Sequence, residues 1–141
     1  MNKEFIPYEQ ALVLKELGFD EPCFGYYKEN QYELNKEFHC YNSDYVEHLG
    51  VYIAAPLYQQ AFRFFKEKYK LQVYIDFYHS ESYFFKIKSQ DGRYIGNTGD
   101  IILQGSPVFT RTYEEAELHC LKKLIEIVKH KNNYGTSKQS L

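Results

Sequence analysis

The stretch LQVYIDFYHSESYFFKIK, residues 71–88, decides the fold that we predict for this chain. Apolar side chains occupy every second position from Leu71 to Phe77, which is the pattern of a strand with one buried face. A turn at 79–81 separates this run from a second alternating run at 83–88. Two alternating runs joined by a short turn predict an antiparallel hairpin.

Helix-forming patterns flank this hairpin on both sides. Before it, apolar side chains at spacings of three and four predict a helix from Pro56 or Leu57 to Tyr69. After it, Thr112 begins a capping box, and the apolar stripe behind it predicts a helix that closes with basic residues at Lys131.

Turn signals between the hairpin and the last helix predict further strands. Asp91-Gly92 is a tight-turn dipeptide, and residues 97–100 mark another turn. We therefore predict a third strand between these turns. A short last strand is expected at 101–104, before the break at Gly105-Ser106-Pro107.

The first part of the chain carries one clear helix signal. Pro7 suits the first position of a helix and Gly18 suits the left-handed residue after its last turn, so we predict a helix from Tyr8 to Leu17. The residues expected on its inward face are Ala11, Leu12, Leu14 and Leu17.

The segment after this helix is predicted to form a hairpin. Residues 23–27 and 31–34 flank a polar tripeptide that suits a turn. Residues 38–41 suit another strand and residues 42–50 suit a loop.

Together these elements predict the α+β class, because helices accompany antiparallel strands. We expect an antiparallel sheet of three to five strands with helices packed on one face, and the order helix–meander–helix in residues 56–131. A single domain is predicted for residues 1–131, with an acidic helix and hairpin at 1–53 and the helix–meander–helix core at 54–131. A polar tail is predicted at 132–141.

Length and composition exclude several classes of protein. The chain has 141 residues, which suits one domain, and its content of Leu, Ile, Val and Phe exceeds the roughly 20% level below which chains tend toward disorder. The net charge of −2 excludes a uniformly basic nucleic-acid coat. No apolar leader is present, and the longest uncharged stretch is too short and polar to span a bilayer. We predict a cytoplasmic protein without membrane contact.

Three sequence blocks carry a resemblance. The first runs from YEQAL at 8–12 through LGFDEPCF at 17–24, the second is APLYQQAFRFF at 55–65, and the third is TYEEAE at 112–117. In these blocks the chain resembles a family of small uncharacterised proteins of gut bacteria and their phages. The resemblance implies a phage-related or mobile-element context and carries no activity with it.

The order of elements over Pro56–Lys131 carries a second resemblance. Helix, three strands and helix, with a last helix that begins YEEAE, are similar in topology to the double-stranded-RNA-binding domain. That family places lysines at the start of this helix to meet phosphates, whereas this chain has Glu114, Glu115 and Glu117. Three carboxylates would repel a duplex, so the resemblance implies the topology and leaves the RNA-binding role in doubt.

Residues able to hold a metal ion lack the close spacing of zinc ligands. Cys23 lies far from the adjacent pair His39 and Cys40, and neighbours in a strand point to opposite faces. The glycine-rich run at 92–99 lacks the G-K-[S/T] of a phosphate-binding loop. We therefore predict no metal site, no cofactor and no catalytic residues. The remaining alternative is a hydrolase that joins Asp76 or a cysteine to a histidine.

Aromatic residues are the unusual feature of the composition, with 15 Tyr and 11 Phe. Tyrosine suits both half-buried sheet faces and interfaces, and basic residues are interleaved with tyrosines around the hairpin. The candidate binding surface that we predict consists of Tyr74, Tyr78, Lys86, Lys88, Arg63, Lys66 and Arg93.

This surface predicts a small non-enzymatic binding module. We expect it to act through protein–protein contact or through self-association as a homo-oligomer. The alternative is a nucleic-acid-binding module that stacks bases on a basic, Tyr-rich sheet face.

Overall fold

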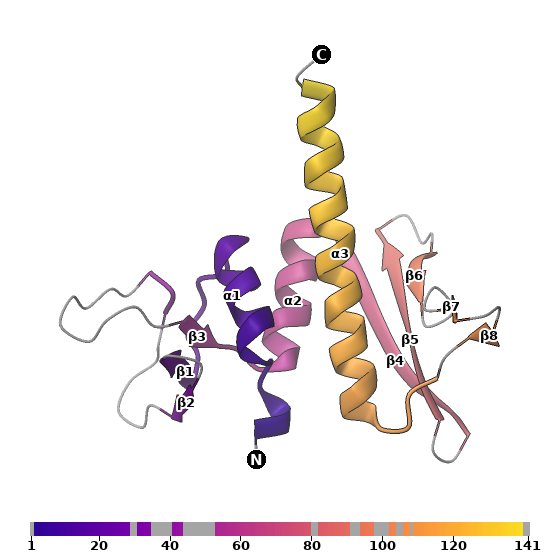
Figure 1. The fold of residues 1–141 in the computed structure, drawn as a ribbon, viewed down its shortest axis with the longest axis horizontal. Coiled ribbons are helices and arrows are strands. Elements are labelled where there is room, and N and C mark those ends of the chain that lie inside the picture. Colours follow the sequence, from indigo (N-terminus) through magenta and orange to yellow (C-terminus); the bar gives the residue numbers. More distant parts are fainter. Residues whose placement is uncertain are drawn as a thin grey trace. The chain divides into compact units, whose positions relative to one another are not determined.

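The fold was analysed in a computed structural model (Figure 1). The residues that it describes are 2–28, 31–34, 41–43, 53–79, 82–90, 94–97, 102–103, 106–107 and 109–139. The chain divides into two compact units, Met1–Arg63 and Phe64–Leu141. Each unit combines helix with antiparallel strands, so the α+β class is confirmed. The single domain of residues 1–131 stays a prediction.

The first unit contains a short sheet and the helix α1. Its elements are the 3₁₀ turn η1 (Asn2–Glu4), α1 (Tyr8–Glu16), β1 (Gly25–Lys28), β2 (Gln31–Leu34), β3 (Ile53–Ala55) and the first half of α2 (Tyr58–Tyr69). The predicted hairpin is confirmed, because β1 and β2 pair antiparallel with Lys28 opposite Gln31. β3, which the sequence patterns did not predict, pairs with the other edge of β1. The strand expected at 38–41 lies almost entirely outside the described residues.

The predicted end of α1 at Gly18 is confirmed by its backbone. Gly18 has a φ of 98°, which a residue with a Cβ adopts only at a cost. Its N–H donates to the Lys15 carbonyl at 3.1 Å, and the Phe19 N–H donates to the Leu14 carbonyl at 2.8 Å. These two bonds form the Schellman motif. The inward position predicted for Leu12 is wrong, because its side chain is exposed.

The second unit is built on a three-stranded antiparallel sheet in the order β4-β5-β6. Its strands are β4 (Leu71–His79), β5 (Ser82–Ser89) and β6 (Tyr94–Asn97). A separate two-stranded sheet follows in the chain and consists of β7 (Ile102–Leu103) and β8 (Ser106–Pro107). A single residue, Lys70, joins α2 to β4 and takes a φ of 59° to do so. The described strands are thus divided among three sheets, and the expected count within one sheet is not confirmed.

The helix α3 (Tyr113–Gln139) covers one face of the sheet β4-β5-β6 (Figure 1). Half of its predicted capping box is confirmed, since the Glu115 N–H donates to Thr112 Oγ1 at 3.1 Å. The Glu115 carboxylate reaches back one residue further than a capping box requires and accepts the Arg111 N–H at 3.1 Å. The end expected at Lys131 is wrong, because the helix continues to Gln139. The apolar stripe stops at Val128, but a formed helix extends by one hydrogen bond per residue without needing an apolar face.

The core of the second unit lies between α3 and the sheet. The fully buried side chains on the sheet are Leu71, Phe85 and Ile87, and those on α3 are Ala116, Cys120, Leu121, Leu124 and Val128. The alternation on β4 predicted that Phe77 shares this buried face, which is wrong, because Phe77 is 64% exposed. Apolar side chains at every second position of a strand show which residues share a face of the sheet. They do not show how much of that face the covering helix buries.

No helix among the described residues is both long enough and apolar enough to cross a membrane.

Candidate functional site

Three of the predicted site residues lie together on one face of β4 and β5. Tyr74 is directly opposite Lys86 in the ladder, and Lys88 is opposite Gln72. The Lys88 ammonium lies 5.4 Å from the centre of the Tyr74 ring, and the Lys86 ammonium lies 5.5 Å from the Phe84 ring. These distances are within the range of cation–π attraction. We call Tyr74, Phe84, Lys86 and Lys88 the basic face.

Lys66 lines an open hollow at the junction of α2 and β4. The hollow has a volume of about 260 Å³ and is lined by Lys66, Glu67, Lys70, Gln72 and Gln90. Gln72 belongs to the same strand face as Tyr74, two positions earlier, so the hollow continues the basic face toward α2. The hollow thus places Lys66, a predicted residue, together with Lys70, which was not predicted, and with the carboxylate of Glu67.

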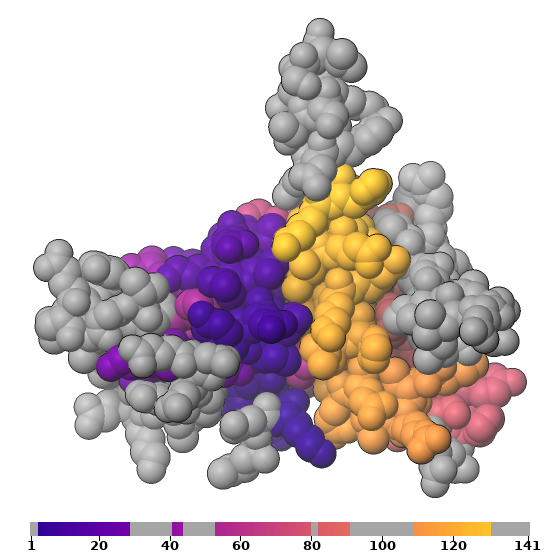
Figure 2. Space-filling model, viewed as in Figure 1, coloured from indigo at the N-terminus to yellow at the C-terminus, as the bar shows by residue number. Residues whose placement is uncertain are grey.

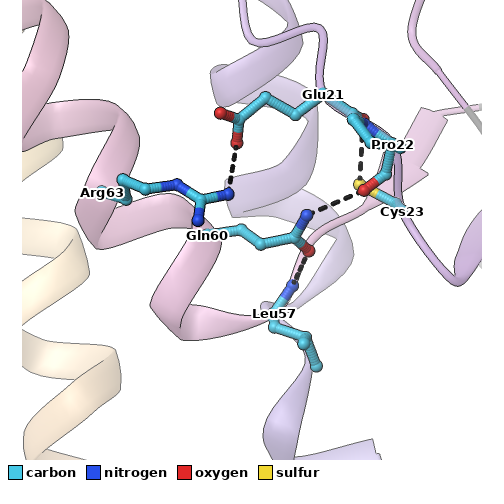
Figure 3. A network of polar contacts seen from close by, with 6 residues as sticks. All are labelled: Glu21, Pro22, Cys23, Leu57, Gln60 and Arg63. Atoms are coloured by element: carbon cyan, nitrogen blue, oxygen red, sulfur yellow. Dashed lines mark hydrogen bonds and ion pairs between the residues drawn. The ribbon is translucent and has the colours of Figure 1, made fainter.

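The Arg63 side chain forms an ion pair within the first unit. Its guanidinium lies 3.6 Å from the Glu21 carboxylate, whose Oε2 atom is buried (Figure 3). The same part of α2 is tied to the loop after α1 by Gln60, whose Oε1 accepts the Leu57 N–H at 3.0 Å and whose Nε2 donates to the Pro22 carbonyl at 2.8 Å. Arg63 therefore supports this loop contact. Arg93, the remaining basic residue of the prediction, lies outside the described residues.

Tyr78 lies at the far end of the β4–β5 hairpin, where the register shifts between Phe77 and His79. Its ring stacks on Phe109 at a centroid distance of 5.5 Å. The ring of Tyr113, at the start of α3, meets Tyr83 edge-on at 6.1 Å. Figure 2 shows the segment that begins α3 adjoining this end of the hairpin.

Four large aromatic side chains are exposed at this end of the second unit. The exposed fractions are 64% for Phe77, 66% for Tyr78, 40% for Phe109 and 45% for Tyr113. We call these four residues the aromatic tip.

A backbone bridge holds the two halves of the aromatic tip together. The Tyr83 N–H donates to the Thr110 carbonyl at 2.8 Å, and the Thr110 N–H donates back to the Tyr83 carbonyl at 3.1 Å. Thr110 is buried, and its hydroxyl also donates to the Thr112 carbonyl at 3.1 Å. The segment that carries Phe109 is therefore fixed against β5.

Sequence reasoning identified Tyr78 in this cluster and missed the other three residues. Phe77 was assigned to the core, and neither Phe109 nor Tyr113 carries a local signal. Their contacts with the hairpin join segments far apart in the chain, and such contacts leave no periodic pattern.

Among the described side chains of the second unit, burial raises the pKa of three groups. The pKa of Cys120 is raised far above its usual value, mainly by burial and also by the charge of Glu117. The pKa of Tyr113 is raised by burial and then by Glu117 and Cys120. The pKa of Tyr69 is raised by burial. All three groups are therefore neutral at pH 7.

Three described side chains that could take part in catalysis, Asp76, Cys23 and Cys120, have a structural partner or are buried. Asp76 is exposed, and its Oδ1 accepts the Phe77 N–H at 2.8 Å. Cys23 and Cys120 are both buried thiols. In the described part of the chain, no three His, Cys, Asp or Glu side chains gather as a metal site would require. The hydrolase alternative stays a prediction.

Comparison of the chain with family models, curated proteins and solved structures found no match. The two resemblances in sequence and topology therefore stay predictions.

Proposed function

We propose that the chain is a non-enzymatic protein-binding module and that the aromatic tip is its contact surface. The observation that carries this proposal is the exposure of Phe77, Tyr78, Phe109 and Tyr113 at one end of the second unit. Exposed apolar patches of this kind mark interaction sites, and Tyr and Phe are enriched at protein interfaces. The proposal includes a cytoplasmic location and the phage-related setting that the sequence resemblance implies.

The rings of the aromatic tip are held in a fixed arrangement, which favours a binding surface over aromatic side chains that are merely exposed. The stack of Tyr78 on Phe109 and the bridge of Tyr83 to Thr110 hold the rings in place before a partner arrives. A surface that is already ordered loses less conformational entropy on binding. The four side chains of the tip are themselves uncharged, so burying them requires no desolvation of an ion of their own.

The double variant Tyr78→Ser/Phe109→Ser is expected to lose partner capture by at least about tenfold, because clustered aromatic anchors dominate interface energies. The measurement is affinity capture with quantitative mass spectrometry, in which an untagged copy of the chain counts as a partner. Each captured protein is then purified and its affinity measured directly.

The matched control is Phe24→Ser, which removes an aromatic side chain that is 51% exposed in the first unit. It should leave capture unchanged. Equal capture by the native chain and the double variant would contradict the proposal.

A second candidate function, nucleic-acid binding, is favoured by one specific arrangement. The basic face pairs two lysines with two aromatic rings, and the hollow beside it adds Lys66 and Lys70. Single strands bind such surfaces by stacking bases on aromatic rings while cations follow the phosphates.

Charge reversal at Lys86 and Lys88 tests this candidate. Fluorescence polarisation with labelled single- and double-stranded DNA and RNA is expected to show binding at about 50 mM salt that weakens steeply by about 200 mM. The variant Lys86→Glu/Lys88→Glu should then lose binding, while Lys122→Glu/Lys129→Glu, with the same charge change at exposed positions on α3, should retain it. No binding at the lower salt, or equal losses in both variants, would remove this candidate.

A further inference from the structure

The aromatic tip has an acidic side chain beside it on each of the two segments that form it. On β4, the exposed residue Asp76 directly precedes Phe77. On α3, the exposed residue Glu114 directly follows Tyr113. These segments are far apart in the chain, and the tip brings them together. The carboxylates therefore accompany the exposed rings from both sides of the contact.

The net charge of the two segments is negative. Residues 76–79 and 109–117 together contain four carboxylates and a single guanidinium, that of Arg111, when histidine is counted as neutral. Glu117 lies one helical turn after Tyr113, and its charge is one of the causes, after burial, that raise the pKa of Tyr113. The exposed rings are thus surrounded by a negative electrostatic field.

Two of these carboxylates are not neutralised by the described part of the chain. Glu115 serves the start of α3, because it accepts the Arg111 N–H at 3.1 Å. Asp76 accepts the Phe77 N–H at 2.8 Å through Oδ1, which leaves its charge in place. Among the described residues, neither Asp76 nor Glu114 forms an ion pair. The helix dipole favours a carboxylate at Glu114, but it does not cancel the charge.

We infer that the aromatic tip binds a basic segment of a partner protein, rich in lysine or arginine. The inference rests on the proposed function, because it names the chemistry of the partner that the same tip takes. Lysine and arginine bury their aliphatic stems on apolar surface while the charged head stays polar. Their heads are also attracted to the faces of aromatic rings. A basic segment can therefore cover the rings and meet the carboxylates at the same time.

Other partner chemistries fit this surface less well. A purely apolar segment would bring Asp76 and Glu114 close to a dry interface without an opposite charge, and such desolvation costs free energy. An acidic segment or a phosphate backbone would place like charges opposite each other. The rings thus mark the contact surface, and the carboxylates determine the sign of the charge that it accepts.

Three synthetic peptides with the same apolar content test the inference. Each consists of three repeats, which are Lys-Ser-Leu-Ser in the first peptide, Gln-Ser-Leu-Ser in the second and Glu-Ser-Leu-Ser in the third. Fluorescence polarisation measures the affinity of each labelled peptide for the full chain. At about 50 mM salt the lysine peptide should bind about tenfold or more tightly than the glutamine peptide, and the glutamate peptide should bind least. The advantage of lysine should shrink by about 200 mM salt.

The variant Asp76→Asn/Glu114→Gln removes the two charges and keeps the shapes of the side chains. It should weaken binding of the lysine peptide by at least about threefold and leave the glutamine peptide unaffected. The matched control is Glu9→Gln/Glu16→Gln, which removes two exposed carboxylates from α1 in the first unit. This control should bind the lysine peptide like the native chain.

The inference would be overturned by equal affinities for the lysine and glutamine peptides, by equal losses in the two charge variants, or by no binding of the lysine peptide. Tyr78→Ser/Phe109→Ser should also weaken the lysine peptide, and unchanged binding there would show that the peptide lies elsewhere. If all three peptides bind equally and depend on Tyr78 and Phe109, the proposed function stands and the partner is not basic. The capture experiment decides the proposed function separately, because it does not depend on the charge of the partner.

Discussion

Replacement of Phe85 by alanine is expected to lower the free energy of unfolding of the second unit by about 3–5 kcal/mol. Phe85 is fully buried on β5, opposite Ile75, on the sheet face that α3 covers. Removing the ring takes away its transfer free energy and leaves a cavity that the helix and sheet close only in part. Urea titration followed by circular dichroism measures the change.

The neighbouring residue Phe84 provides the matched control. It is the same residue type on the same strand, but it points to the opposite, basic face and is half-buried. Phe84→Ala should therefore cost less than half as much as Phe85→Ala. Equal costs would contradict the assignment of the core to the Phe85 face.

The second prediction concerns alkaline pH and the buried thiol of Cys120. Burial raises the pKa of Cys120 in the folded chain, and the charge of Glu117 adds to this effect. Below the unfolded-state pKa of about 8.5 the thiol is protonated in both the folded and the unfolded chain. In this range its ionisation takes nothing from the free energy of unfolding. Above that pH the unfolded thiol loses its proton while the folded thiol keeps it. The free energy of unfolding should then fall by about 1.4 kcal/mol per pH unit from this group.

Urea titrations at about pH 7.5, 9 and 10.5 measure this slope, with Cys120→Ala as the control. The variant should be somewhat less stable at the lowest pH, because it loses a buried sulfur atom, and its stability should fall less steeply as the pH rises. The difference between the two slopes isolates Cys120 from the other titrating groups. Identical slopes in the native chain and the variant would contradict the prediction.

Local signals predicted the local features of the chain well. Gly18 takes the left-handed conformation that the end of α1 requires, and Thr112 caps α3 through the Glu115 N–H. The hairpin of β1 and β2 follows from two short runs around a turn. Each of these features depends on residues within a few positions of one another, so a short stretch of sequence contains the whole cause.

Local signals predicted only part of the candidate binding surface. Tyr74, Lys86 and Lys88 meet as predicted, because alternation and a tight turn determine which residues of a hairpin share a face. Arg63 was grouped with them as one of the basic residues interleaved with tyrosines along the chain, yet its partner is Glu21. A helix carries neighbouring residues in different directions, so closeness in sequence did not predict a shared surface.

The amino-acid sequence by itself determined the α+β class, the helices that flank the hairpin and the two-residue alternation of β4 and β5, because periodic patterns and capping residues act over short distances. Only the tertiary structure decided that Phe77 is exposed, that Phe109 and Tyr113 join Tyr78, and that the outer edge of β4 has no paired strand among the described residues. These features arise where segments distant in sequence pack against each other or fail to. Packing of that kind depends on the extent and shape of the covering elements, which no local pattern records.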